Sequence, residues 1–198
     1  MRVVIVGAEG TVGRAAVSAL AHHQIIKVGR SSGDIRADLI DAKSIAEMFE
    51  KLGRVDAVVA CAGHVHFGPL QTMTGDQFMT GLQNKLMGQV NLVLVGKDHV
   101  NDNGSFTLTS GILDRDPIRQ GANASTVNAA LAGFVLSAAV EMPRGIRINV
   151  VSPGLLQDSA EKYDGFFPGH EPVSSERVGL AYVKSVDGGL TGRVIAVG

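Results

Sequence analysis

A short apolar strand that runs directly into a glycine-rich turn is the feature that most constrains this chain. Residues 3–6 are Val-Val-Ile-Val, Gly7, Gly10 and Gly13 follow at three-residue spacing, and residues 14–20 are typical of a helix. In a strand–turn–helix unit such glycines allow a tight turn, a close approach of the backbone to a phosphate, and close packing of the helix on the strand. The pattern predicts a pyrophosphate site at the helix N-terminus, with a turn that binds no ligand as the alternative.

The rest of the chain alternates short apolar runs with helix-like segments. Strands are predicted at residues 2–6, 24–28, 35–38, 57–61, 105–109, 147–151 and 193–197. Helices are predicted after the cap Asp41, after the capping pair Thr74 and Gln77, over 129–142, and over 176–186 after Ser174 or Ser175. Most strands are continuously apolar, which is typical of parallel strands covered on both faces. We predict an α/β fold: one Rossmann-type domain over residues 1–198, with a doubly wound parallel sheet of seven strands in the order 3-2-1-4-5-6-7.

Composition and charge argue against several classes of protein. The formal net charge is −1, which gives no reason to expect binding to nucleic acid or to an acidic membrane. Cys61 is the only cysteine, so no intrachain disulfide can form, and its place after an apolar run predicts a buried reduced thiol. No secretory leader precedes the first strand, and no apolar run approaches membrane-spanning length. We therefore expect a cytoplasmic protein.

The end of the second predicted strand bears on the choice of cofactor. It reads Lys-Val-Gly-Arg-Ser-Ser, without the carboxylate that often binds the adenosine ribose in dinucleotide folds. Arg30 offers a fork of donors, and Ser31 and Ser32 offer hydroxyls and amides, a set that suits a 2′-phosphate. This predicts NADP(H) in preference to NAD(H), with a solvated surface arginine as the alternative. Asp38 and Leu39 are expected to flank the adenine ring, unless Asp38 is only a turn carboxylate.

Several ordered segments resemble the short-chain dehydrogenase/reductase family over nearly the whole chain. They are the glycine turn in its GxxGxxG spacing, Ala-Cys-Ala-Gly at 60–63, Asn84 on a helix, Ser110 after the fifth strand, residues 144–154 with their Pro-Gly end, and Thr191-Gly192. The resemblance implies a bound nicotinamide cofactor, with Ser110 and Asn84 in the active site. The cofactor contacts expected from the turn and the resemblance are Gly7, Glu9, Gly10, Thr11, Val12, Gly13, Cys61, Ala62, Gly63, Pro153, Gly154 and Leu155.

One departure from the family pattern concerns the proton donor. The family has a tyrosine followed four residues later by a lysine, whereas this chain has Ala124 and Asn128 at the matching positions. Its two tyrosines, Tyr163 and Tyr182, are distant from that segment in the sequence. The chain therefore resembles a short subgroup of the family that lacks the pair. General acid catalysis is worth roughly two to four powers of ten, so its loss slows a reaction without forbidding it.

Other side chains can be considered as substitutes for the missing pair. Ser110 and Asn84 can polarise an oxygen. His64 and His66 follow the fourth strand at the carboxyl edge of the sheet, where an imidazole can act as acid or base; simple packing of the loop is the alternative. Asn128 can hydrogen-bond a ribose in place of the lysine. No set of residues with metal-ligand spacing is evident, and no metal is predicted.

Two further residues are expected to contribute little. Lys85 follows Asn84 on a helix, where one residue turns a side chain by about 100°, so we expect it to be solvated or at an interface. Tyr163 belongs to the irregular segment 155–172, which we interpret as a functional loop or lid. A mobile loop is a poor place for a preorganised acid. Phe166 and Phe167 in the same segment suggest an apolar wall.

Three functional hypotheses follow from the sequence. The first is an NADP(H)-dependent oxidoreductase that reduces a carbonyl or oxidises an alcohol with a non-standard active site. The second is a non-catalytic NADP(H)-binding sensor or regulatory protein, and the third is a scaffold with a vestigial site. The helices at 84–95 and 129–142 carry small and apolar residues around much of their surface, which predicts a homodimer or homotetramer. The sequence does not define the substrate.

Overall fold

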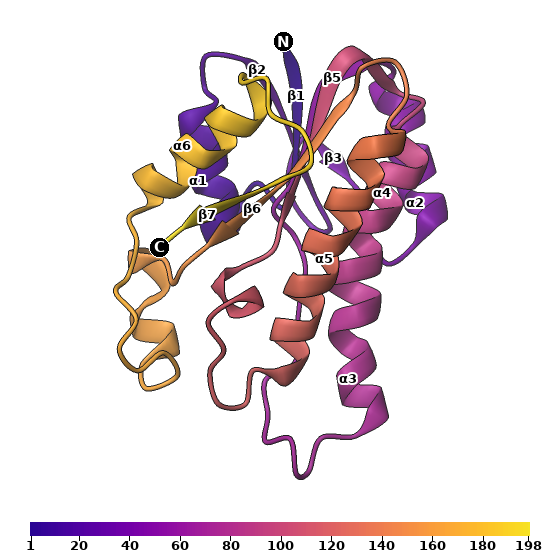
Figure 1. Ribbon diagram of the computed structural model, residues 1–198. Helices are drawn as coiled ribbons and strands as arrows, with labels where there is room; N and C mark the ends of the chain where they lie inside the picture. The colour runs from indigo at the N-terminus through magenta and orange to yellow at the C-terminus, as the bar shows by residue number, and fades with distance from the viewer.

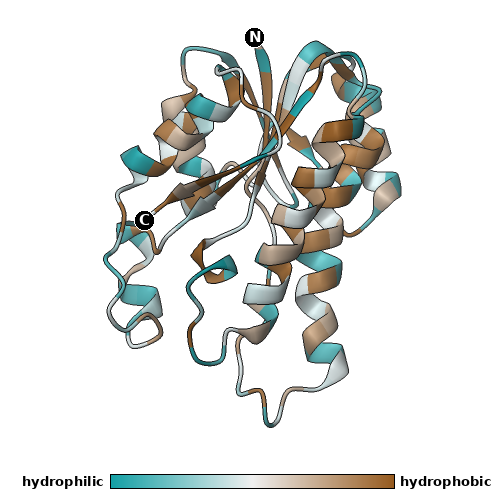
Figure 2. Cartoon of the chain, viewed as in Figure 1, coloured by the Kyte–Doolittle hydropathy of each residue, from teal (hydrophilic) through white to brown (hydrophobic).

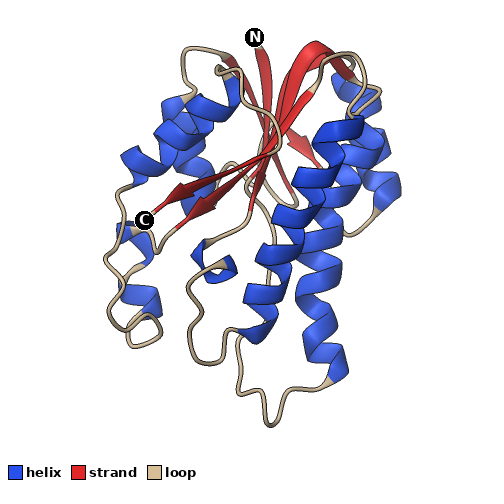
Figure 3. Ribbon diagram, in the orientation of Figure 1, coloured by secondary structure: helices blue, strands red, loops and turns tan.

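A computed structural model, which describes residues 1–198, has one parallel sheet between two layers of helices (Figures 1 and 3). The strands are β1 (Arg2–Val6), β2 (Gln24–Gly29), β3 (Ile35–Arg36), β4 (Val55–Ala60), β5 (Val100–Thr109), β6 (Arg147–Pro153) and β7 (Arg193–Val197). The sheet has seven strands in the order β3-β2-β1-β4-β5-β6-β7, and every pairing is parallel. The predicted fold class and strand order are confirmed.

The helices divide between the two faces of the sheet (Figure 1). They are α1 (Thr11–Ala19), α2 (Ala42–Leu52), α3 (Gly75–Gly81), α4 (Gly88–Gly96), α5 (Ala122–Glu141) and α6 (Ser175–Val186). A π-helical segment, η1 (Leu82–Met87), joins α3 to α4, and short 3₁₀ turns form η2 (Ile112–Asp114), η3 (Gln157–Ser159) and η4 (Glu161–Tyr163). Helices α1 and α6 pack together on one face, while α2, α4 and α5 cover the other.

The predicted helix caps are observed. The Asp41 side chain accepts a hydrogen bond from the Lys43 amide, and Thr74 with Gln77 forms a reciprocal capping box. Of the two serines proposed to cap α6, it is Ser174 whose hydroxyl accepts from a first-turn amide. These side chains satisfy amides that have no partner within the helix.

The continuous apolar runs of the strands are explained by burial on both faces. In β1, Val4 and Val6 pack under α2 and the neighbouring helices, whereas Val3 and Ile5 pack in the cluster beneath α1 and α6. Side chains alternate across a strand, so both sets must be apolar when both faces are covered. The strands are accordingly mostly hydrophobic in Figure 2.

Several predicted boundaries differ from the structure. Strand β3 ends at Arg36, because Asp38 instead starts a turn in which its Oδ1 accepts from the Ile40 amide at 3.1 Å. Strand β4 ends at Ala60, so Cys61 begins the following loop. Strand β5 starts at Val100, and β6 continues to Pro153. Helix α5 begins at Ala122 rather than at residue 129, since its first turn includes the buried Asn123, whose amide donates to the Phe78 carbonyl oxygen.

Helix α5 also corrects an expectation about membrane-spanning length. Its 20 residues, with a hydropathy of 1.3, are long and apolar enough to cross a bilayer by length and composition alone. Val127, Leu131 and Val135 are buried in the core under the sheet. Leu136 and Val140 instead remain on an exposed face, with Val140 86% exposed. Packing within the fold therefore accounts for part of the apolar composition of α5.

Because all strands run in one direction, their carboxyl ends meet at one edge of the sheet. Gly7, Cys61, Ser110 and Gly154 each follow directly after a strand and lie along this edge. In open parallel sheets this edge is where ligands bind. The segment 155–172, with η3 and η4, lies at the same end of the molecule in Figure 1.

Candidate cofactor and active site

The turn after β1 is built to accept an anion. Gly7 has φ +82°, and a Cβ there would lie 2.8 Å from the Ala62 nitrogen. A Cβ at Gly13 would overlap the Gly7 carbonyl oxygen, so the close approach of α1 to the turn also needs a glycine. Gly10 caps α1 without any side-chain hydrogen bond. The first amides of α1 therefore have no side-chain partner, and the helix dipole favours negative charge there.

Two cavities lie along the carboxyl edge of the sheet. An outer cavity of about 440 Å³ includes Arg30 and Asp38 in its lining, and an inner cavity of about 360 Å³ includes Ser110. Ala62 and Gly63 line both, so the two cavities adjoin. Together they form a trough from the end of β2 to the end of β5. A nucleotide with a reactive group at its far end suits this shape, because ligand sites of this fold lie at this edge.

Predicted cofactor residues divide between these cavities. Gly7, Arg30, Asp38 and Leu39 line the outer one, while Thr11, Val12, Cys61, Pro153, Gly154 and Leu155 line the inner one, and Ala62 and Gly63 line both. Gly10 and Gly13 line neither and act through the backbone shape of the turn. Glu9, Ser31 and Ser32 are exposed and also line neither cavity. The Glu9 carboxylate instead pairs with Lys27 at 3.2 Å.

The sequence indicates Asp38 either as a residue beside the adenine ring or as a turn carboxylate, and its position allows both. It lines the outer cavity, and it also holds the turn after β3 through the Ile40 amide. Arg30 is exposed in the same cavity, with no hydrogen-bonded partner for its guanidinium. Its donors are therefore free to bind an anion entering this end of the trough.

The positions matching the family tyrosine and lysine lie in the inner cavity, as predicted. Ala124 offers no polar group there, and Asn128 is buried with its Oδ1 accepting from Lys85 Nζ at 2.8 Å. Tyr182 does not replace the missing phenol, since its hydroxyl bonds Thr109 Oγ1 at 2.6 Å in the core. Burial, followed by the nearby Cys61, raises the pKa of Tyr182 well above its ordinary value.

The prediction that Lys85 points away from the site is wrong. Its Nζ donates to the Ser110 carbonyl oxygen and to Asn128 Oδ1, each at 2.8 Å, and it lines the inner cavity. The two neighbouring side chains do point in different directions, but the expected reference direction was wrong. Asn84 lines the outer cavity, so it is Lys85, one residue further along η1, that lines the inner cavity.

The Lys85 ammonium is held in an environment that disfavours its charge. Burial lowers its pKa to about 8, and the charge of Asp114 opposes that shift. Gly63 makes room for the side chain, because a Cβ at that position would lie 2.5 Å from Lys85 Cγ. The site thus contains a group that can hold or release a proton near neutral pH.

Asn84 takes a different place from the one predicted. Its Oδ1 accepts from the His64 amide at 2.7 Å, and it lines the outer cavity but not the inner one. The Asn84 side chain therefore fixes the loop after β4 and does not face the reacting end of the trough.

The two loop histidines lie away from the Ser110 end of the trough. His64 is exposed and lines the outer cavity, and His66 is partly buried and lines neither cavity. It is their backbone that is held, because the amide of His66 donates to Asn123 Oδ1 at 2.9 Å and that of His64 to Asn84. An acid–base role for either imidazole finds no support in these positions.

Ser110 is placed as predicted, and its hydroxyl is unusual. The residue is 4% exposed and lines the inner cavity, and its Oγ has no hydrogen-bond partner. Buried polar atoms are nearly always hydrogen-bonded, so an unpartnered hydroxyl on a residue that lines a cavity is a candidate contact for a ligand.

Cys61 is a free thiol, as predicted, but the residue is only partly buried, because it lines the inner cavity. Burial raises its pKa to about 11, against smaller opposing effects of Tyr182 and Thr109. A thiol with this pKa is not a nucleophile near neutral pH. Cys61 therefore contributes shape rather than chemistry to the inner cavity.

The segment 155–172 forms an aromatic wall, as its sequence suggested. Tyr163 and Phe167 line the inner cavity together with Phe67, whose ring centroid lies 6.2 Å from that of Tyr163. Phe166 does not line the cavity and is 38% exposed. Tyr163 therefore lies nearer to the site than its place in the sequence suggested, although its hydroxyl makes no hydrogen bond within the chain.

Gln89 is a structural residue of the site that sequence reasoning missed. It is fully buried, and its side-chain amide makes two hydrogen bonds with the backbone of Thr109. Its Nε2 donates to the Thr109 carbonyl oxygen at 2.9 Å, and its Oε1 accepts from the Thr109 amide at 2.8 Å. It thereby fixes the end of β5 just before Ser110. The signal was a single glutamine within an apolar helix, since a buried polar side chain needs partners.

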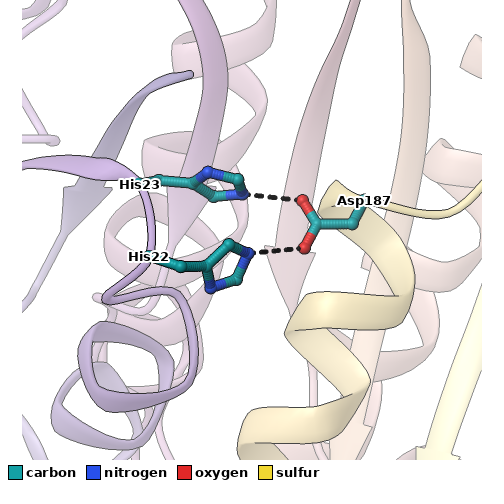
Figure 4. Close-up of side chains that lie close together, drawn as sticks. All are labelled: His22, His23 and Asp187. Carbon is teal, nitrogen blue, oxygen red and sulfur yellow. Dashed lines mark hydrogen bonds and ion pairs between the residues drawn. The ribbon is translucent and has the colours of Figure 1, made fainter.

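Only one group of side chains is arranged to hold a metal ion. The ligand atoms of His22, His23 and Asp187 lie within 4.8 Å of one another, at the opposite edge of the sheet from the trough. The two imidazoles already bond the carboxylate (Figure 4). The two cavities contain no comparable group, so the chemistry of the trough relies on other residues.

Comparison with known proteins agrees with this geometry. Residues 1–178 match the family model described as Enoyl-(Acyl carrier protein) reductase. The chain is 28% identical over 162 residues to versicolorin reductase 1 of Dothistroma septosporum, covering 78% of this chain and 62% of that protein. It is 28% identical over 148 residues to the short-chain reductase protein NovJ of Streptomyces niveus, covering 69% of this chain and 56% of that protein. The chain thus spans less than two thirds of these curated relatives.

Solved structures extend the likeness to the whole chain. The protein lin1944 from Listeria innocua is 46% identical with a TM-score of 0.98, and both chains are fully covered. A small-chain dehydrogenase is 26% identical with a TM-score of 0.85, over 100% of this chain and 95% of that one. With the family model matching nearly the whole length, the chain belongs to the short-chain dehydrogenase/reductase family.

Proposed function

We propose that this protein is an NADP(H)-dependent oxidoreductase that reduces a carbonyl group or oxidises an alcohol. The observation that carries the proposal is the trough along the carboxyl edge. It has an uncapped helix N-terminus for the pyrophosphate, Arg30 at its outer end, and the unpartnered Ser110 hydroxyl at its inner end. The residues of the trough fit a dinucleotide, which supplies the hydride when bound.

The relatives support the class of reaction and of substrate. Versicolorin reductase 1 and hydroxynaphthalene reductase arp2 of Aspergillus fumigatus are reductases by name, the second of a hydroxynaphthalene, and a small-chain dehydrogenase of the same fold is a complex with NADPH. The inner cavity has aromatic walls at Phe67, Tyr163 and Phe167. A cyclic or aromatic ketone matches such walls, because aromatic rings pack favourably on one another.

A non-catalytic NADP(H) sensor is the second candidate. The absence of a phenol at Ala124 favours it, since the site then lacks the usual proton donor of the family. The two candidates share cofactor binding and differ in turnover.

Two measurements test these candidates. Fluorescence titration with NADPH and NADH should give tighter binding of NADPH, and equal affinities would contradict the role of Arg30. Absorbance of NADPH should then fall with a panel of cyclic ketones, quinones and β-keto esters. Saturable NADPH binding without turnover on this panel would favour the sensor.

We also propose that the protein is a homodimer or homotetramer that pairs through α4 and α5. Leu94, Leu136 and Val140 leave large apolar side chains exposed on these two helices. Such patches commonly mark association sites. Light scattering should give a multiple of the 20.7 kDa chain mass, and a monomer at micromolar concentration would contradict this proposal.

A further inference from the structure

Two hydrogen-bond donors of the inner cavity have capacity left for a ligand. The Lys85 ammonium has three N–H groups, and two of them are used by the Ser110 carbonyl oxygen and by Asn128. The third has no partner within the chain. The Ser110 hydroxyl is also without a partner, and it belongs to the residue whose carbonyl oxygen Lys85 binds. Both free donors thus belong to residues that line the inner cavity and are joined through the Ser110 carbonyl oxygen.

The position of Lys85 is fixed by three separate parts of the fold. Lys85 lies on the π-helical segment η1, Gly63 leaves room for its stem, and the Asn128 side chain on α5 accepts a hydrogen bond from its head. π-Helical segments often occur at functional sites. A long side chain held in this way loses little further freedom when it binds a ligand, which is the preorganisation that catalysis needs.

We propose that Lys85 is a catalytic residue: with the Ser110 hydroxyl, its ammonium binds the reacting oxygen of the substrate and donates a proton to it during reduction. This inference rests on the proposed function. The substrate carbonyl carbon receives a hydride from NADPH, and the π electrons of the C=O bond move to oxygen. That oxygen takes the proton from Lys85 Nζ, which gives the alcohol, NADP⁺ and a neutral amine. The amine then takes a proton from water.

The electrostatic surroundings of Lys85 are suited to this exchange. Its lowered pKa of about 8 allows both protonation states near neutral pH. Asp114 is the charge that favours the ammonium form, and the other titratable side chains of the same cavity are Cys61, Lys162 and Tyr163. No carboxylate forms an ion pair with Lys85, so its proton is not tied to a fixed anion.

The first test needs neither cofactor nor substrate. Competitive labelling of the apo protein with an amine-reactive reagent between pH 6 and 11, read by mass spectrometry, gives a titration curve for each lysine. Lys85 should titrate with a midpoint about 8, below the ordinary lysine value of about 10.4. A Lys85 midpoint at the ordinary lysine value would overturn the proposal.

The second test uses two variants of Lys85 and a surface control. Lys85→Met and Lys85→Arg should each lower the rate of ketone reduction by about 10²- to 10⁴-fold, while NADPH affinity changes by less than about threefold. The guanidinium of Lys85→Arg keeps the charge but does not release a proton near neutral pH. Lys43→Met should behave as the wild type. The wild-type rate of reduction should fall as pH rises through about 8, because the acid must be protonated.

These outcomes separate the inference from the proposed function. If wild-type protein does not bind NADPH, the proposed function fails. If it binds NADPH and Lys85→Arg retains turnover, Lys85 only positions other groups and the proposal is overturned. Tyr163→Phe gives a further check. Abolished turnover in that variant together with normal turnover in Lys85→Met would identify Tyr163, and not Lys85, as the proton donor.

Discussion

The two edges of the sheet hold polar side chains in opposite states. At the amino edge, both oxygens of Asp187 are used, one by His22 Nε2 at 3.0 Å and one by His23 Nε2 at 2.7 Å (Figure 4). At the carboxyl edge, Lys85 keeps a free N–H and Ser110 keeps a free hydroxyl. Polar groups that satisfy one another stabilise the fold, whereas groups left without partners are available to a ligand. The comparison therefore separates a structural cluster from a binding site.

After the Lys85 variants described above, the largest effect is expected from removal of the other free donor, the Ser110 hydroxyl. Ser110→Ala should lower turnover by about 10²- to 10³-fold, as for the loss of one donor to a developing oxyanion. The free energy of unfolding should stay within about 0.5 kcal/mol of the wild-type value, since the hydroxyl makes no hydrogen bond that the change would remove. Ser125→Ala is the matched control, because Ser125 Oγ is also unpartnered but lines neither cavity. Equal turnover in the two variants would contradict the claim that the free Ser110 hydroxyl at the carboxyl edge takes part in the reaction.

Removal of a hydrogen-bonded side chain at the carboxyl edge, that of Gln89, should lower the stability of the fold, unlike removal of the Ser110 hydroxyl. Gln89→Leu leaves the amide and carbonyl of Thr109 without their partners. We expect a loss of about 1–3 kcal/mol in the free energy of unfolding for the unsatisfied groups, measured by urea denaturation. The exposed Gln83→Leu change should have almost no effect. If Gln89→Leu were as stable as Gln83→Leu, the two hydrogen bonds between Gln89 and Thr109 would not stabilise the end of β5.

Arg30 should affect affinity and not stability. Arg30→Ala should weaken NADPH binding by about 10- to 100-fold, the worth of one or two hydrogen bonds to a charged group, and leave NADH binding nearly unchanged. Isothermal titration calorimetry measures both affinities. Arg36→Ala, a change on the neighbouring strand outside both cavities, is the control. An equal loss for both cofactors would place Arg30 away from the 2′-phosphate.

The smallest effect belongs to the amino edge. Although burial favours the neutral acid, the hydrogen bonds of His23 and His22 outweigh it and lower the pKa of Asp187. A lowered pKa in the folded state stabilises the fold above the unfolded pKa of about 4, and this stability is lost as pH falls through the folded value. Asp187→Asn should therefore cost about 0.3–1 kcal/mol at pH 7 and nothing at pH 2, with NADPH affinity unchanged. Asp98→Asn, which changes an exposed carboxylate, is the control.

The sequence predicted much of the trough because its signals are local. Glycine spacing, a strand composed of Val and Ile, and capping residues such as Thr74 and Gln77 act within a few residues of one another. Strand pairing in a parallel α/β fold then follows from the order of elements. For this reason the positions of Arg30, Ser110 and the Pro153-Gly154 end were predicted correctly.

Lys85 and Asn84 could not be placed from the sequence. Helix geometry predicts that the two side chains diverge, but only the packing of η1 in the fold shows that Lys85 lines the inner cavity and Asn84 the outer one. Tyr163 was given too little weight, and Gln89 was missed, for a related reason. Their roles depend on contacts with Phe67 and Thr109, which are distant in the chain.

The amino-acid sequence by itself determined the parallel α/β sheet, the glycine-rich turn after β1 and the absence of a phenol at position 124, because periodicity and residue identity fix these directly. Tertiary structure decided which polar groups are satisfied. It paired His22 and His23 with Asp187, and it left one N–H of Lys85 and the hydroxyl of Ser110 without a hydrogen-bond partner. Hydrogen-bond satisfaction depends on the positions of atoms from separate segments to within a few tenths of an ångström, and no local pattern specifies that.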